Sequence, residues 1–266
     1  MIFSILFAVF SIFPVSFFFY TLSERLIATH ELRVGKQIKF PSFLVQTWVD
    51  AKLECKKLLS NWMWAVYLLQ FSILFCFDLD IEYLTFIYFA LNAFVGVVLV
   101  TKYRDGVVER IEADRMQIRT AVGLSIATFC VFGCFTPSQT TSLAQIHFSV
   151  LELLFVIPFQ LAGMILFGEY PFGGMSKKTG WLQSARFYGW SMLATKLFLG
   201  GGSFFIDFHI KAAILYVLCR LFGVYFPKFH HRDLLRISIL YLFPLTGILW
   251  LFAMLTYGFI GGSSRV

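Results

Sequence analysis

The stretch YLTFIYFALNAFVGVVLVT, residues 83–101, contains no charged side chain. Its apolar residues form one continuous run instead of alternating with polar ones, which favours a helix over a half-buried strand. A helix of about 20 apolar residues has the length needed to cross the roughly 30 Å hydrocarbon core of a bilayer. The stretch therefore predicts a membrane-spanning helix.

Apolar runs of similar length recur along the chain. Hydrophobic residues make up 59% of its 266 residues and charged residues 14%, whereas soluble domains are about a quarter charged. The first run lacks the basic start and the cleavage site of a signal peptide, so we expect it to be retained. The predicted fold is an all-α integral membrane protein, a single polytopic domain over residues 1–266 with about eight transmembrane helices. The spans are expected near 2–21, 62–78, 83–101, 120–136, 147–168, 186–204, 209–226 and 238–259.

The distribution of basic residues predicts an orientation. Lys and Arg gather in the loops after the first, third, fifth and seventh predicted spans, and the other loops carry none. Because basic loops stay on the cytoplasmic or matrix side, we expect the odd-numbered loops to face that side. The net charge of +7 comes from these short loops, so the expected partner is a lipid bilayer and not nucleic acid.

The longest polar interruption is LSERLIATHELRVGKQIKFPSFLVQTWVDAKLECKKLL, residues 22–59. Apolar and charged residues mix over its second half, which begins just after Pro41. Proline is tolerated at the start of a helix, and such mixing is typical of a helix lying at a membrane surface. We predict an amphipathic surface helix near residues 43–59.

Charged residues also fall inside the predicted spans. Glu152, Lys196 and Lys211 are the clearest examples. A charge at mid-membrane costs about 2.5–3.5 kcal/mol, so such residues are functional candidates, above all for a proton pathway. Snorkelling toward the headgroups and a purely structural ion pair remain the alternatives.

Two loops carry further candidate functional residues. Residues 104–119, RDGVVERIEADRMQIR, place Glu109 and Glu112 among arginines at helical spacing. A solvated helix with ordinary ion pairs explains that pattern equally well. Residues 168–181, GEYPFGGMSKKTGW, place Glu169 and Phe172 beside glycines, which suits either a loop that adapts to a ligand or a plain turn.

The sequence contains no self-contained active site. It has no nucleophile elbow, phosphate-binding loop, dinucleotide fingerprint or zinc motif. Cys130 and Cys134 lie one helical turn apart, but no other ligand accompanies them. Metal binding is therefore not expected.

Three regions, in order along the chain, resemble the quinone-site membrane subunit of proton-pumping NADH–quinone oxidoreductase, respiratory complex I, a family found in mitochondria and bacteria. The sequence SERLIATHELRVG at 23–35, with LVQTWVD at 44–50, resembles the family's E-R…Q-x-R-x-G-P and L-L-Q-P-x-A-D motifs. LFLGG at 197–201, followed by Lys211, resembles L-F-L-G-G…K. RLFGVYFPKFHHRDLL at 220–235, followed by FPL at 243–245, resembles R-A-x-x-P-R-x-R-x-D-Q-L-M…F-L-P-L.

The chain also departs from the family pattern. After Pro171-Phe172 it has two glycines where the family has a series of acids, and Gln46 precedes Thr47 instead of proline. The acidic connection between the quinone cavity and the proton path would therefore be built from Glu109, Glu112 or Glu152, or from a neighbouring subunit.

The resemblance implies a core subunit that forms the quinone access tunnel and couples ubiquinone reduction to proton translocation. Ubiquinone would be its substrate, while metals and flavin would stay on partner chains. The quinone cavity would comprise Arg25, Arg33, Gln46, Asp50, Phe172 and Lys228. The proton relay would comprise Glu24, Glu109, Glu112, Glu152, Glu169 and Lys211.

The expected partners are the other complex I membrane subunits and the quinone-proximal iron–sulfur subunits of the peripheral arm. The expected location is the mitochondrial inner membrane, with the bacterial plasma membrane as the alternative. Two other functions remain open. One is a stand-alone transporter using Glu152, Lys196 and Lys211, and the other is the anchor subunit of a related membrane-bound hydrogenase.

Overall fold

The computed structural model describes residues 13–30, 45, 48–49, 69–70, 81–102, 107–134, 150–167, 180–199, 205–225, 233 and 236–263. Near the ends of several helices it describes the backbone alone. Within these residues every regular element is helical. The helices are α2 (Phe13–His30), α5 (Ile81–Lys102), α6 (Val107–Cys134), α7 (Val150–Phe167), α8 (Gly180–Phe198), α9 (Phe205–Tyr225), the π-helical η4 (Ser238–Leu242) and α11 (Phe243–Ser263).

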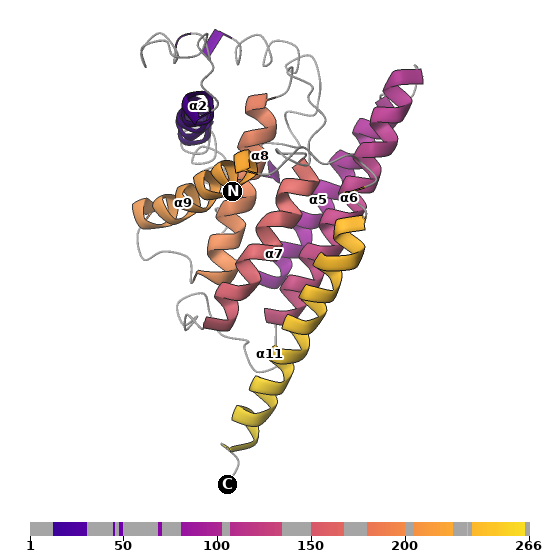
Figure 1. Cartoon of the computed structure of the whole chain (residues 1–266), viewed down its shortest axis with the longest axis vertical. Helices are drawn as coiled ribbons and strands as arrows, with labels where there is room; N and C mark the ends of the chain where they lie inside the picture. Colours follow the sequence, from indigo (N-terminus) through magenta and orange to yellow (C-terminus); the bar gives the residue numbers. More distant parts are fainter. Residues whose placement is uncertain are drawn as a thin grey trace.

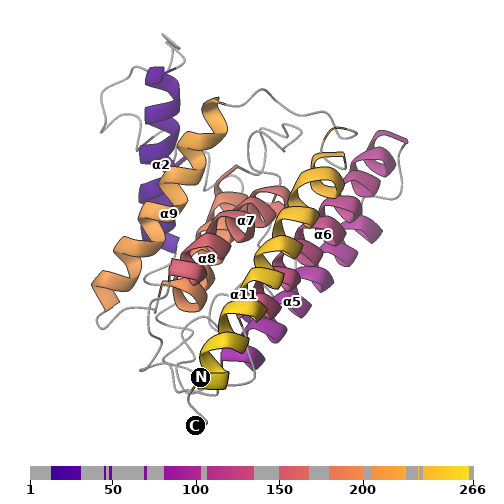
Figure 2. The ribbon, with the colours of Figure 1, turned by 60° about the horizontal axis from the view of Figure 1, so that its bottom comes forward.

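The helices form a layered bundle with α7 and α8 at its centre. α6 packs on α7, and both α5 and α11 pack on α6. On the other side of the centre, α8 packs on α9, and α2 contacts both α8 and α9. Figures 1 and 2 show α2 and α9 on one side of the bundle and α5, α6 and α11 on the opposite side.

The prediction of an all-α fold is confirmed, but the prediction of about eight transmembrane helices is wrong. Within the described ranges, none of the helices combines the length and the apolar character that crossing a bilayer requires. Charged residues share helices with apolar ones: α6 joins the charged segment 107–119 to the apolar segment 120–134 without a break. Similarly, α9 carries Asp207, Lys211 and Arg220 along one helix. The apolar run predicted at 120–136 therefore did not mark where α6 begins.

The surface helix predicted over residues 43–59 lies almost entirely outside the described residues. Val45, Trp48 and Val49 are the exceptions, and each is helical and exposed. The ring of Trp48 meets Phe17 of α2 edge to face, with centroids 5.7 Å apart. This contact places one residue of the first polar stretch against α2.

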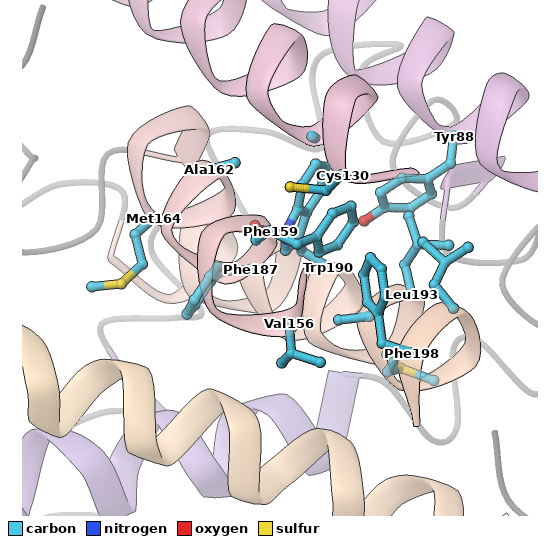
Figure 3. Packing of buried hydrophobic residues seen from close by; sticks show 14 of the residues in the cluster. Tyr88, Cys130, Val156, Phe159, Ala162, Met164, Phe187, Trp190, Leu193 and Phe198 are labelled. Atoms are coloured by element: carbon cyan, nitrogen blue, oxygen red, sulfur yellow. Dashed lines mark hydrogen bonds between the residues drawn. The ribbon is translucent and has the colours of Figure 1, made fainter. Parts of the chain in front are cut away.

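An aromatic cluster around Trp190 of α8 fills the centre of the bundle. The Trp190 ring stacks on Phe159 of α7 with centroids 4.5 Å apart, and on Phe89 of α5 at 5.6 Å. Its indole Nε1 donates a hydrogen bond to the carbonyl oxygen of Phe159 at 3.0 Å. Figure 3 shows Trp190, Phe159 and Tyr88 directed toward one another among other buried side chains. Stacked aromatic pairs add about 0.5–1.5 kcal/mol beyond the area they bury, so this cluster holds α5, α7 and α8 together.

Glycine allows the close approach of α6 to α7. A Cβ atom added at Gly123 would lie 2.9 Å from both the carbonyl oxygen of Ala162 and the Cβ of Leu166. Both obstacles belong to the α7 backbone or its first side-chain atom, so neither can move aside without shifting the helix. In contrast, a Cβ at Gly247 of α11 would meet nothing within 4 Å.

We expect Gly123→Ala to lower the free energy of unfolding by about 1–3 kcal/mol, the usual cost of overpacking. The matched variant Gly247→Ala should gain up to about 1 kcal/mol, because alanine favours a helix over glycine and the site is open. Chemical denaturation of the two variants beside the unmodified chain measures both changes. Equal stability of the two variants would contradict the close α6–α7 contact.

Candidate functional site

A column of three rings forms where α2, α8 and α9 meet. Phe19 of α2 stacks on Tyr188 of α8 with centroids 6.2 Å apart and planes 13° from parallel. The ring of His209 of α9 lies nearly parallel to that of Tyr188, with centroids 6.2 Å apart and planes at 7°. Tyr216, on the same helix as His209, meets the edge of Tyr188 at 5.8 Å. Residues far apart in the sequence thus build one compact aromatic site.

The polar atoms of this column pair with each other. The Tyr188 hydroxyl lies 2.9 Å from Nδ1 of His209, and it also lies 3.4 Å from the His209 carbonyl oxygen. Tyr188 is fully buried, while 7% of His209 is exposed. Burying a polar group costs free energy unless the group is hydrogen-bonded. The bond between Tyr188 and His209 therefore offsets the cost of burying both side chains.

Burial keeps both side chains neutral near pH 7. Burial raises the pKa of the Tyr188 hydroxyl above its ordinary value, and the neighbouring Tyr216 raises that pKa further. Burial lowers the pKa of His209 to about 4. A neutral phenol and a neutral imidazole can each donate one hydrogen bond and accept another, so the two side chains pair without a buried charge.

Two buried cations lie over aromatic rings of α2 and α9. The guanidinium carbon of Arg220, which is buried on α9, lies 5.7 Å from the centroid of the Tyr20 ring of α2. The ammonium of Lys196, which is buried near the end of α8, lies 5.9 Å from the centroid of the Phe208 ring. A cation over an aromatic face is favourable, more so when water is excluded. The last turn of α8 also favours a positive charge through the helix dipole.

A second polar cluster joins α5 to α8. Nη2 of Arg186 donates to Oδ1 of Asn92 at 3.1 Å, and Nδ2 of Asn92 donates to the carbonyl oxygen of Tyr88 at 2.9 Å. Burial raises the pKa of the Tyr88 hydroxyl, and the charge of Arg186 partly opposes that rise. Asparagine cannot titrate and arginine stays protonated, so this cluster fixes the two helices to each other and offers no exchangeable charge of its own.

No protein-family model matches the chain, and no curated protein matches it either. The resemblance drawn from the sequence motifs therefore has no independent support from these comparisons, and the function it implies is a proposal.

Two of the predicted site residues have described side chains. Arg25 lies half-buried on α2. Lys211 lies on α9 and forms an ion pair with Asp207, with 3.1 Å between Nζ and Oδ2. The two helices that carry Arg25 and Lys211 pack against each other.

The other predicted residues lie outside the described side chains. The backbone of four is described within α2, α6 and α7, and the remaining six fall outside the described ranges altogether. The four are Glu24, Glu109, Glu112 and Glu152, and the six are Arg33, Gln46, Asp50, Glu169, Phe172 and Lys228. Whether these residues gather at one site stays a prediction.

Tyr188 and His209 are absent from the predicted set. The signal that could have found them is a histidine in the mainly apolar first half of α9, FIDFHIKAAILYVL. A histidine in such a setting must be neutral or paired, but the sequence does not show which residue pairs with it. Among the described residues, no group of three or more His, Cys, Asp or Glu side chains could hold a metal ion.

Proposed function

We propose that the chain is the quinone-site subunit of a proton-pumping NADH–ubiquinone oxidoreductase. In this proposal it forms the access route for ubiquinone and couples quinone reduction to proton translocation. Electrons would come from the iron–sulfur subunits of the peripheral arm, so this chain would hold neither metal nor flavin. The complex would belong to the mitochondrial inner membrane, or to the plasma membrane of a bacterium.

One observation carries the proposal: three of the helices with family-like motifs are neighbours in space, whereas the FPL at 243–245 begins α11 on the opposite side of the bundle. The Glu24-Arg25 pair lies on α2, the LFLGG sequence begins at the end of α8, and Lys211 and Arg220 lie on α9. These three helices pack on one another, with α2 and α9 on one side of the central α8 (Figure 2). The motif on α2 thus lies against helices that carry motifs from much further along the chain.

The chemistry of that region suits an apolar substrate with a polar headgroup. Phe19 and Tyr188 stack on each other between α2 and α8, and Trp48 from the first polar stretch lies against Phe17 of α2. Small apolar ligands bind in sites lined mainly by aromatic and aliphatic groups with a few polar ones. Arg25, half-buried on α2, can supply a hydrogen bond to a quinone oxygen.

We expect Arg25→Ala to raise the KM for ubiquinone about tenfold, equivalent to about 1.4 kcal/mol of lost binding. The complex should still assemble, which native gel electrophoresis checks, because the change truncates a half-buried side chain at a helix surface. Arg115→Ala is the matched control, since Arg115 lies exposed on α6 on the opposite side of the bundle. The measurement is NADH-driven ubiquinone reduction at varied quinone concentration.

An assembled Arg25→Ala complex with unchanged quinone kinetics would count against the proposal. The partner list gives a second test. Migration of the chain in a very large complex with iron–sulfur subunits that oxidise NADH would support the proposal. If hydrogenase subunits accompany the chain instead, it would be the anchor subunit of a membrane-bound hydrogenase. A chain that migrates alone and acts in liposomes would favour a transporter.

A further inference from the structure

Gln70 is a polar side chain that points into the bundle. Gln70 and Leu69 are adjacent helical residues, yet Leu69 is 46% exposed while Gln70 is fully buried. This reverses the usual arrangement, in which glutamine faces water and leucine faces the core. Burying an amide costs free energy unless its polar atoms are hydrogen-bonded, so Gln70 needs partners inside the bundle.

Both ends of the Gln70 amide lack such partners. Neither its Nε2 nor its Oε1 forms a hydrogen bond with any group in the part of the chain that the structure describes. The buried amide of Gln160 differs, because its Oε1 accepts a hydrogen bond from the Ser191 hydroxyl at 3.5 Å. The Gln70 amide therefore keeps its whole hydrogen-bonding capacity unused within the described residues.

The hydroxyl of Tyr88 is a further unbonded polar group, and it lies beside Gln70. Tyr88 is fully buried on α5, and its hydroxyl oxygen bonds to none of the described residues. Burial raises the pKa of this hydroxyl, while the charge of Arg186 and the side-chain amides of Asn92 and Gln70 act in the opposite direction. A neutral amide has such an effect only at close range, so Gln70 and Tyr88 face a common site.

The neighbouring Asn92 is already committed. Its Nδ2 donates to the Tyr88 carbonyl oxygen at 2.9 Å, and its Oδ1 accepts from Nη2 of Arg186 at 3.1 Å. The unbonded atoms of the site are thus a donor and an acceptor on Gln70 and a Tyr88 hydroxyl that can do either. One small molecule that donates and accepts at once satisfies all three. Water does so, and a buried water molecule typically makes about three hydrogen bonds.

We propose that ordered water binds between Gln70 and Tyr88 and bridges the segment at residue 70 to α5. The water accepts a hydrogen bond from the Tyr88 hydroxyl and donates one to Oε1 of Gln70, while Nε2 of Gln70 donates to the same water or to a second one. An anion suits the site less well, because Oε1 of Gln70 would repel it.

The site lies beside the central aromatic cluster, since the Tyr88 and Trp190 rings have centroids 6.2 Å apart (Figure 3). It is therefore distinct from the contact of α2, α8 and α9 on which the proposed function rests, and the inference does not depend on that function.

The direct test is a crystal or cryo-EM structure of the unmodified full chain, alone or in its complex, in which ordered water molecules are visible. We expect a water oxygen at about 2.7–3.2 Å from both the Tyr88 oxygen and the Gln70 amide. A direct hydrogen bond between the two side chains would overturn the inference. Any occupant other than water, or a water that contacts only one of the two residues, would overturn it as well.

A double-mutant cycle tests the bridge in solution. Tyr88→Phe and Gln70→Leu should each raise the equilibrium constant of unfolding about tenfold, because each leaves the remaining polar group and the water with an incomplete set of hydrogen bonds. The double variant replaces both partners by apolar groups of similar size, so its constant should lie within about threefold of that of the unmodified chain. Chemical denaturation of the four chains measures these constants.

Tyr188→Phe combined with Gln70→Leu is the matched control cycle. Tyr188 is also a fully buried tyrosine, but its hydroxyl bonds to His209. Its effect should therefore multiply with that of Gln70→Leu, as expected for independent sites. If the effects of Tyr88→Phe and Gln70→Leu also simply multiply, the two side chains share no water and the inference fails. If a variant does not fold, the structure of the unmodified chain decides.

Discussion

Trp190→Ala is expected to lower the free energy of unfolding by about 3–5 kcal/mol, the range for truncating a large buried aromatic side chain. Trp190 is fully buried. Its ring contacts Phe159 and Phe167 of α7 and Phe89 of α5. Removing it opens a cavity that three helices line, and it leaves the carbonyl oxygen of Phe159 without its hydrogen-bond donor.

Two further variants make this prediction specific. Trp190→Phe keeps an aromatic ring but loses the indole N–H, so it should cost less than Trp190→Ala. Phe86→Ala removes an aromatic side chain that is 73% exposed on α5, and its effect should stay within about 0.5 kcal/mol. Denaturant unfolding, followed by tryptophan fluorescence and far-UV circular dichroism, gives the free energy of unfolding of all three variants. A loss for Trp190→Ala no larger than that for Phe86→Ala would show that this cluster does not hold the bundle together.

Helical content was predictable because long apolar runs without strand alternation favour helices strongly. The run at 83–101 corresponds to α5, and the run at 147–168 corresponds to α7. What the runs did not predict is where α6 begins. α6 starts in the charged segment at Val107, well before the apolar run at 120, because alternating Glu and Arg at helical spacing continue a helix as readily as apolar residues do. Treating apolar length as the only criterion produced the transmembrane assignment that the structure contradicts.

The candidate site was less predictable than the fold. The motifs placed Arg25 and Lys211 on separate segments, and the structure brings their helices, α2 and α9, into contact. The pairing of Tyr188 with His209 depends on how α8 crosses α9, and no local pattern encodes a crossing of two helices. Trp190 illustrates the same limit: its partners Phe89 and Phe159 come from two other helices, and Gly163 leaves room for its ring. Choosing candidate residues by their spacing along the sequence therefore misses side-chain pairs that form only when the helices pack together.

Acid is expected to destabilise the folded chain through His209. Burial lowers the pKa of this imidazole to about 4 in the folded state, while an unfolded histidine titrates near about 6.5. Above pH 6.5 or so neither state binds the proton, so His209 has no effect on the pH dependence there. As the pH falls below that value the unfolded state takes up a proton that the folded state refuses, and stability falls until the folded imidazole also titrates.

The free energy of unfolding lost through His209 alone should reach about 3 kcal/mol by pH 4, because each pKa unit corresponds to about 1.4 kcal/mol. Other groups titrate in the same window, so the informative quantity is a difference between variants. His209→Gln cannot bind the proton, and its free energy of unfolding should fall less than that of the unmodified chain between pH 7 and pH 4. Denaturation midpoints measured across that range supply the comparison. Parallel pH profiles would mean that His209 is already solvated in the folded chain, in which case the buried pairing with Tyr188 would have to be abandoned as well.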